Sequence, residues 1–216
     1  MSNLNGETLI WSNYLDLEAD VKTWLQIPIT APSKFDYQLQ LLTDMTCQWV
    51  QNKMGRPIAP TQFTRYFDGN SGWNGAFIEL PYYPVLSVAS VTEYWGTSGP
   101  HVLLESTPTS QVDGWQCEYL RGTLRRVFQG LVERPWFPGS RNIEVTWTAG
   151  YNPVPADIKI ATLEMIAHWW RNTQQQAGNR PSISEYDPEA VASGLWQGTP
   201  LRITTLLDSF IQVGIA

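Results

Sequence analysis

The chain has 216 residues, enough for one domain with a sizeable core or for two smaller ones. Charged residues make up only 16% of it and apolar residues 43%, which indicates that partner subunits cover part of its surface. The net charge of −6, without any run of Lys or Arg, disfavours a phosphate-binding surface, because nucleic-acid binding relies on clustered cations.

The two cysteines, Cys47 and Cys117, lie far apart and lack C-x-x-C spacing. A disulfide framework is therefore not predicted, and a reducing compartment fits. No basic N-terminal segment precedes an apolar run, and no apolar run approaches the roughly 20 residues of a membrane helix. We expect a soluble intracellular product.

Two helices are predicted in the first 60 residues. Residues 16–26 begin at Asp16 as N-cap, and one helical face carries Leu17, Val21, Trp24 and Leu25. The second helix begins near Ser33 with a capping box and closes at Gly55, a left-handed cap. Its apolar residues recur at spacings of three or four: Phe35, Leu39, Leu42, Met45 and Trp49.

A β-rich block follows over residues 61–150. Alternating residues predict a strand at 61–67, which a Gly- and Asn-rich turn joins to a strand at 76–80 as a hairpin. Further strand candidates are residues 86–95, 101–105, 115–121, 123–128 and 145–149. The corner from Gly150 to Pro155 ends the block.

The third helix, residues 155–174, is apolar along two stripes. Such a helix cannot bury both stripes against one neighbouring layer, so we expect it in a bundle core or a subunit interface. The candidates for that role are Ile158, Met165, Trp169 and Trp170. The predicted fold is α+β, a small helical bundle with a β-rich middle block and an extended C-terminal tail.

The chain is predicted to consist of four segments. Residues 1–60 supply the N-terminal helices, 61–150 the β block and 151–175 the central helix that completes the bundle. Residues 176–216 form a polar, Gly- and Pro-broken tether and an apolar segment at helical spacing. That last segment docks either on its own chain or on a partner.

Catalytic motifs are absent from the sequence. It has no P-loop, G-x-G-x-x-G or G-x-S-x-G, and its two histidines, His101 and His168, lack metal-ligand partners at the usual spacing. We therefore predict no enzyme, metal or cofactor. The alternative is a carbohydrate-binding or glycoside-cleaving β domain, built on tryptophans and paired carboxylates. Its candidate carboxylates are Asp113, Glu118, Glu133 and Glu144, near Trp115, Trp136 and Trp147.

Four stretches resemble the head–tail connector (head-completion adaptor) proteins of tailed bacteriophages. They are "LDLEADVKTWLQI" before a helix that ends in Gly-Arg-Pro, "IELPYYPVLSVASV", "VTWTAGYNPVPADIKIATLEMIAHWW" and "LRITTLLDSFI". Together they span nearly the whole chain in the family's order. The chain departs from the family at Trp147, where Tyr is usual, and in a longer, more aromatic segment at 97–141.

The resemblance implies a structural protein of the virion neck, assembled in the host cytoplasm. Copies form a ring, usually a dodecamer, beneath the portal of a filled capsid. The ring extends the channel through which genomic DNA passes without specific binding, and it presents a surface to the next neck or tail-completion protein. No membrane is involved.

Candidate contact residues follow from this implied role. The apolar positions of the C-terminal segment are the portal-docking candidates: Leu201, Ile203, Leu206, Leu207, Phe210 and Ile211. Aromatic residues of the β block are expected to pack within it or to face an adjacent tail component: Tyr82, Tyr83, Trp95, Trp115 and Trp136.

Overall fold

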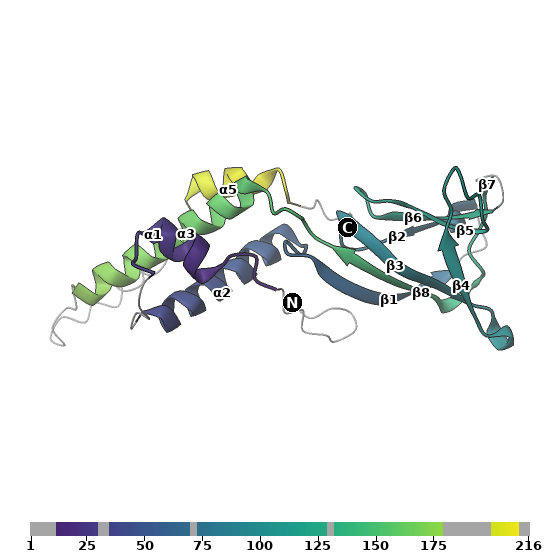
Figure 1. Cartoon of the computed structure of the whole chain (residues 1–216), viewed down its shortest axis with the longest axis horizontal. Coiled ribbons are helices and arrows are strands. Elements are labelled where there is room, and N and C mark those ends of the chain that lie inside the picture. Colours follow the sequence, from purple (N-terminus) through teal and green to yellow (C-terminus); the bar gives the residue numbers. More distant parts are fainter. Residues whose placement is uncertain (1–11, 30–34, 70–72, 129–131, 179–199, 212–216) are drawn as a thin grey trace. The chain divides into compact units, whose positions relative to one another are not determined.

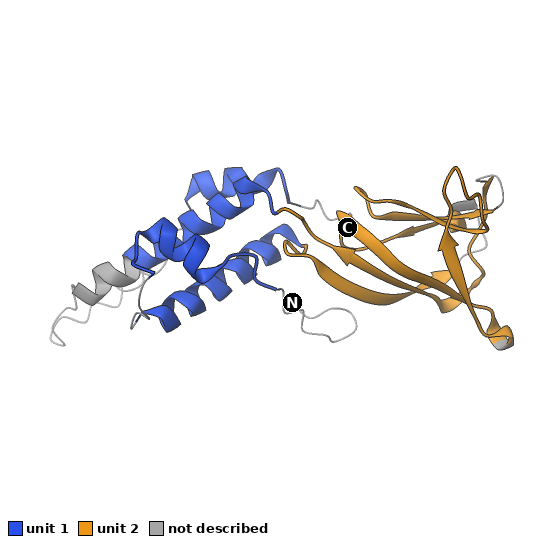
Figure 2. Ribbon diagram, viewed as in Figure 1, with its two compact units in different colours: residues 1–55, 154–216 blue, residues 56–153 orange. Residues whose placement is uncertain are grey.

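The computed structural model describes residues 12–29, 35–69, 73–128, 132–178 and 200–211. The chain divides into two compact units, residues 1–55 with 154–216 and residues 56–153 (Figure 2). The first unit is helical and the second consists mainly of strands, which confirms the predicted α+β class with a β-rich middle. The third predicted helix therefore joins the N-terminal helices in one unit.

The first helical segment is a π-helical stretch, Leu17–Lys22, that continues into α1, Thr23–Leu25. Asp16 caps it as predicted, since its carboxylate accepts from the N–H groups of Glu18 and Ala19 at 2.9 and 2.7 Å. The predicted apolar face is wrong in part: Val21 is buried, but Trp24 is 45% exposed. A π turn holds more residues than an α turn, so positions spaced for 3.6 residues per turn separate.

Helix α2 spans Asp36–Met54, and the predicted capping residue Ser33 lies outside the described residues. Gly55 ends the helix as predicted, with φ of 71° and its N–H donating to the Gln51 carbonyl at 2.9 Å. The buried face of α2 is centred on Leu39, Thr43 and Val50. Met45 was expected on that face, but it is 51% exposed, because it lies two residues beyond Thr43 and so points away from the bundle.

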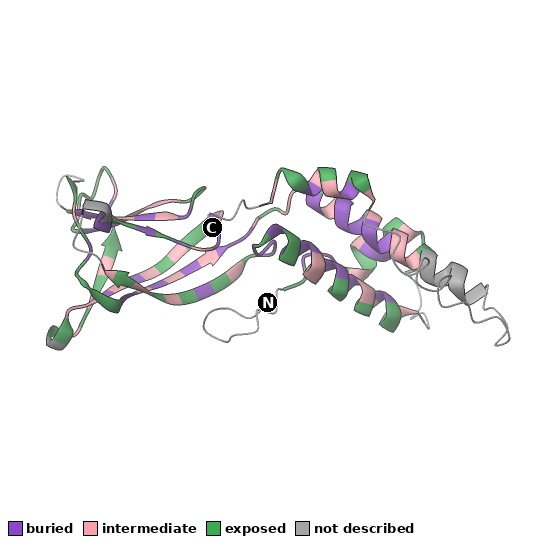
Figure 3. Cartoon of the chain, turned by 180° about the vertical axis from the view of Figure 1, so that it is seen from behind, coloured by how far each residue is buried: buried purple, intermediate pink, exposed green. Residues whose placement is uncertain are grey.

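Helix α3, Ala156–Gly178, begins directly after Pro155 and lies between α2 and α5, Leu201–Asp208 (Figure 1). Because α2 and α5 both pack against α3, the helix buries apolar residues on more than one side, as its two predicted stripes require. Figure 3 shows buried positions along the part of this helix that precedes its grey end. These are Ile158, Ala161, Thr162, Leu163, Met165, Ile166 and Ala167. None of the described helices combines the length and apolarity that crossing a membrane requires.

The β unit is one eight-stranded sheet in the order β1-β8-β3-β4-β5-β6-β2, with β7 paired to β6. The strands are β1 Thr61–Gly69, β2 Phe77–Glu79, β3 Val85–Tyr94, β4 Pro100–Glu105, β5 Gly114–Glu118, β6 Thr123–Phe128, β7 Val132–Glu133 and β8 Gly139–Ala149. The pairs are antiparallel except β4 with β5, which is parallel.

The predicted hairpin between residues 61–67 and 76–80 is wrong. β1 pairs with β8, placing Phe63 opposite Trp147, whereas β2 pairs with β6, placing Ile78 opposite Leu124. A glycine-rich connection signals a turn, but it does not specify which strands pair. Here the long strand β8 takes β1 on one side and β3 on the other.

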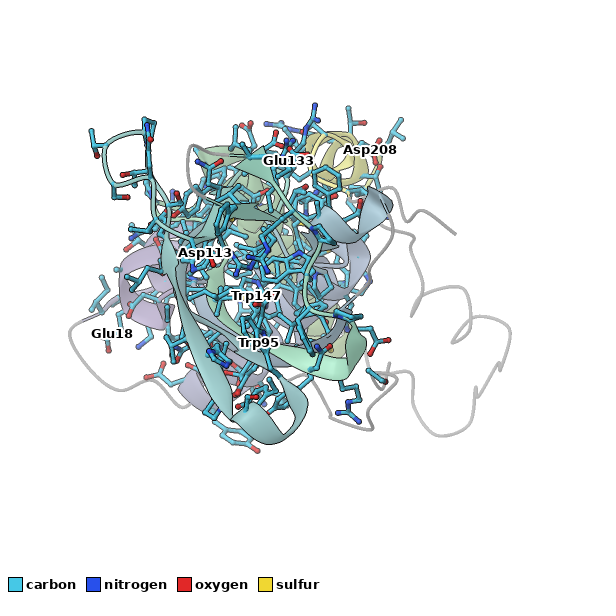
Figure 4. The ribbon with its side chains drawn as sticks, turned by 90° about the vertical axis from the view of Figure 1, so that its right-hand side faces the viewer. Glu18, Trp95, Asp113, Glu133, Trp147 and Asp208 are labelled. Carbon is cyan, nitrogen blue, oxygen red and sulfur yellow. The ribbon has the colours of Figure 1, made fainter. Side chains whose placement is uncertain are left out.

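The sheet curls, so that strands distant in its order approach each other. β3 and β6 are separated by two strands, yet Glu93 of β3 contacts Arg126 of β6 at 3.3 Å. The core of this unit includes Trp147, Ile143 and Leu124, which have no exposed surface. Figure 4 shows Trp147 among the surrounding strands and side chains.

The corner after β8 depends on glycine. Gly150 has φ of 131°, and a Cβ added there would lie 2.6 Å from the Ala59 carbonyl oxygen. Its N–H donates to the Pro84 carbonyl at 3.0 Å, and the next N–H, of Tyr151, donates to the Ile58 carbonyl at 2.9 Å. A side chain at position 150 would therefore displace the backbone that this corner binds.

Candidate assembly surfaces

The candidate residues of α3 lie inside the helical unit of the single chain. Ile158 is fully buried and Met165 is 2% exposed. Trp169 and Trp170 are half-buried and contact α2 or the residue just before it: Trp169 meets Trp49 edge-on at 6.3 Å between ring centroids, and Trp170 meets Phe35 at 5.7 Å. The two tryptophans thus support the packing of α3 on α2.

The C-terminal segment forms α5, which packs along α3 of its own chain. Ile203 and Leu207 are 1% and 0% exposed, and Arg202 pairs with Glu164 of α3 at 3.1 Å. Of the remaining docking candidates, Leu206, Phe210 and Ile211 are half-buried, whereas Leu201 is 82% exposed. Leu201 is therefore the most exposed apolar residue of the segment, whereas Ile203 and Leu207 hold the helix against its own chain.

The aromatic candidates of the β unit are mostly internal. Trp115 and Trp136 are 4% and 1% exposed, and their indole N–H groups donate to the carbonyls of Leu103 and Ala76 at 3.2 and 3.1 Å. Tyr82 packs against the ring of Phe63 at 4.6 Å between centroids. These contacts show that the three rings stabilise the fold of this unit.

Tyr83 and Trp95 are half-buried, and each has a defined neighbour. The Arg56 guanidinium lies over the Tyr83 ring, 5.0 Å from its centroid. The Trp95 ring stacks on Phe137 at 5.3 Å between centroids and meets the His101 ring at a tilt, 4.0 Å between centroids. His168, the other histidine, is half-buried on α3.

The carboxylates proposed for a glycosidase each bind a cation or a hydroxyl. Asp113 pairs with Arg126 and, at 3.5 Å, with Arg134. Glu118 and Glu133 both approach Arg125, at 3.9 and 2.8 Å. The fourth, Glu144, accepts from the Tyr94 hydroxyl at 2.6 Å, and this hydrogen bond raises the pKa of Tyr94.

A buried ion pair, which the sequence did not reveal, connects the strands of the β unit. Arg126 and Glu93 have side chains that are each 1% exposed, and they meet at 3.3 and 3.5 Å. The guanidinium also donates to the carbonyls of Gly114 and Val127 at 2.8 Å, so its charge is fully engaged. In the part of the chain that the structure describes, no group of three or more His, Cys, Asp or Glu is arranged to hold a metal ion.

The outer side of α2 carries an apolar stripe that the sequence analysis missed. Tyr37, Leu41 and Met45 follow each other every four residues and are 80%, 59% and 51% exposed. The spacing was visible in the sequence, but the stronger apolar pattern that includes Leu39 concealed it. Figure 3 shows the exposed positions along this helix.

No protein-family model and no curated protein matches the sequence. Similarity appears among solved structures. A chain from the neck of an empty gene transfer agent (GTA) particle, computed with C6 symmetry, superposes with a TM-score of 0.59 at 15% identity, covering 97% of this chain and 95% of that one. A chain from the native particle's neck, computed with C12 symmetry, gives a TM-score of 0.54 at 14% identity, with 92% and 91% covered. A chain from the virion of the native particle gives 0.57 at 15% identity, with 97% and 95% covered. The chain thus shares its fold, over nearly its whole length, with chains of these phage-like particles.

Proposed function

We propose that this protein is a structural subunit of the neck of a phage-like particle, an adaptor without enzymatic activity. The observation that carries the proposal is the shared fold with a neck chain over 97% of the sequence. It agrees with the adaptor resemblance of four separate sequence stretches, which is an independent line of support because the structural match has only 15% identity.

The proposed assembly is a homo-oligomeric ring, a dodecamer, beneath the portal. The C12 and C6 symmetry of the similar necks supports this arrangement. A closed ring needs two different contact faces on each copy, because a self-complementary face ends in a dimer. The ring would extend the DNA channel and present a surface to the next neck or tail component. A net charge of −6 suits a channel that DNA must pass without binding.

We further propose that α5 contributes to portal attachment through its exposed side. In the single chain Ile203 and Leu207 face α3, so the docking role that the sequence suggested for them passes to Leu201, 82% exposed at the start of the helix. A single leucine contributes little, about 1.5–3 kcal/mol when fully buried. A ring repeats the contact at every copy, and multivalency then makes attachment firm.

The test is association with the cognate portal. The purified chain should co-sediment with portal rings, and Leu201→Asp should weaken this association while the chain stays folded. The same substitution at Leu120, 81% exposed in the β unit, provides a matched control and should co-sediment normally.

The alternative, carbohydrate binding, predicts a different result in the same assay. Sugar platforms need tryptophan rings open to solvent, whereas Trp115 and Trp136 are 4% and 1% exposed. Saturable quenching of tryptophan fluorescence by a soluble polysaccharide, together with no binding to portal, would favour that alternative.

A further inference from the structure

The stripe of Tyr37, Leu41 and Met45 is distinct from the packing face of α2. On the opposite side Leu39, Cys47 and Val50 have no exposed surface, so the helix already buries a complete apolar face within its own unit. The stripe is therefore a second apolar face, two turns long, which the described residues of this chain leave at least half exposed. Contiguous exposed apolar patches with a polar rim often mark the sites where a protein contacts another molecule.

The surroundings of the stripe have the composition of an interface. Gln38 and Asp44 are exposed beside it, and the same side of the helix continues as amides, with Gln48 donating to Asn52 at 3.0 Å. Protein–protein interfaces combine an apolar centre, enriched in Tyr and Met, with a polar rim. A charge count disfavours nucleic acid as the occupant, since this helix carries one lysine, Lys53, against two aspartates.

We propose that this stripe is the contact through which each copy of the chain binds the next copy in the ring. The inference rests on the proposed neck function, because a ring of identical copies requires an interface on every copy. A stripe that paired with itself about a two-fold axis would close a dimer and stop growth. The stripe must therefore meet a different surface of the neighbouring copy, which makes the contact heterologous.

A variant series tests the contact. Leu41→Asp places an unpaired carboxylate at the centre of the stripe, and we expect it to weaken association between copies at least about tenfold. Leu120→Asp introduces the same residue at a position 81% exposed in the β unit rather than on α2, and should assemble like the wild type. Leu41→Met should also assemble, since it keeps an apolar side chain of similar size. Circular dichroism and sedimentation of each variant separate loss of assembly from loss of fold.

A photo-crosslinker at position 41 identifies the occupant. We expect a crosslink from position 41 to a second copy, at a surface other than its own stripe. The experiment uses wild-type assemblies, or the free chain at up to about 1 mM, a concentration at which a contact with a Kd of about 1 mM is half occupied. A link from stripe to stripe, a link within the same chain, a link only to portal, or no link would each overturn the proposal. If particles contain a ring of this chain but the crosslinks lie elsewhere, the inference fails and the neck function stands. If the chain is absent from the neck, the neck function itself fails.

Discussion

We expect Arg126 to be important for the stability of the β unit, because it forms a buried ion pair with Glu93. We expect Arg126→Met to destabilise this unit by about 3–5 kcal/mol, because it leaves Glu93 buried without its counter-charge. Urea unfolding measures the loss. The neighbouring Arg125 supplies the control: its partners are 41% and 46% exposed, and Arg125→Met should cost less than about 1 kcal/mol. Equal losses in the two variants would contradict a special role for the buried pair.

We predict that Cys47 lowers the free energy of unfolding of the helical unit at alkaline pH. Burial raises the pKa of its thiol from 9.0 to about 11. The unfolded chain therefore releases this proton first, so the free energy of unfolding is unaffected below pH 9 and falls as pH rises from 9 towards 11. The slope from this one thiol approaches about 1.4 kcal/mol per pH unit. Unfolding measured at pH 8 and pH 10 should show a smaller drop in Cys47→Ala than in the wild type, and an equal drop would contradict this assignment.

Among the helices, we expect α5 to contribute to the stability of the helical unit by packing on α3. Leu207 has no exposed surface, and Leu207→Ala should cost about 2–5 kcal/mol. Leu201→Ala, at a position 82% exposed on the same helix, should be nearly neutral. Thermal unfolding of the two variants compares them directly. If Leu207→Ala is also neutral, α5 does not pack on α3 in solution and is free to dock elsewhere.

Sequence patterns predicted these elements well where the signal was local. The Asp16 and Gly55 caps, the two-striped α3 and most strands follow from spacing and turn chemistry alone. Two predictions failed for different reasons. The pairing of β1 with β8 depends on a strand far along the chain and cannot be seen from the turn that follows β1. The π turn is local, but the apolar spacing does not announce it, and it moved Trp24 away from its expected face.

For the candidate contact residues too, local sequence spacing predicted part of the result and only the packing of the folded chain shows the rest. Hydrophobic spacing identified the apolar residues of the C-terminal segment, but only packing on α3 separates buried Leu207 from exposed Leu201. The outward stripe of α2 overlapped a stronger pattern in the sequence, so Met45 was assigned to the core. The pair of Arg126 with Glu93 joins strands that are not neighbours in the sheet, and no local spacing announces such a contact.

The two units of the molecule present different surfaces. The helical unit exposes the apolar stripe on α2 and the start of α5, and both are proposed contact sites for assembly. The β unit has its tryptophans at positions 115, 136 and 147 almost entirely buried, which fits a structural module more closely than a sugar-binding surface. Neither unit, in its described residues, brings metal-binding side chains together.

We propose above all that copies of this chain form a ring in the neck of a particle, and a localised reconstruction of that neck tests this ring. Purified particles should show a closed ring beneath the portal whose subunits fit this fold, in the twelvefold arrangement suggested by the C12 symmetry of a similar neck. Mass spectrometry of the same particles should find this chain at a copy number equal to that of the ring. A neck in which this fold is absent, or particles that lack the chain, would contradict the account.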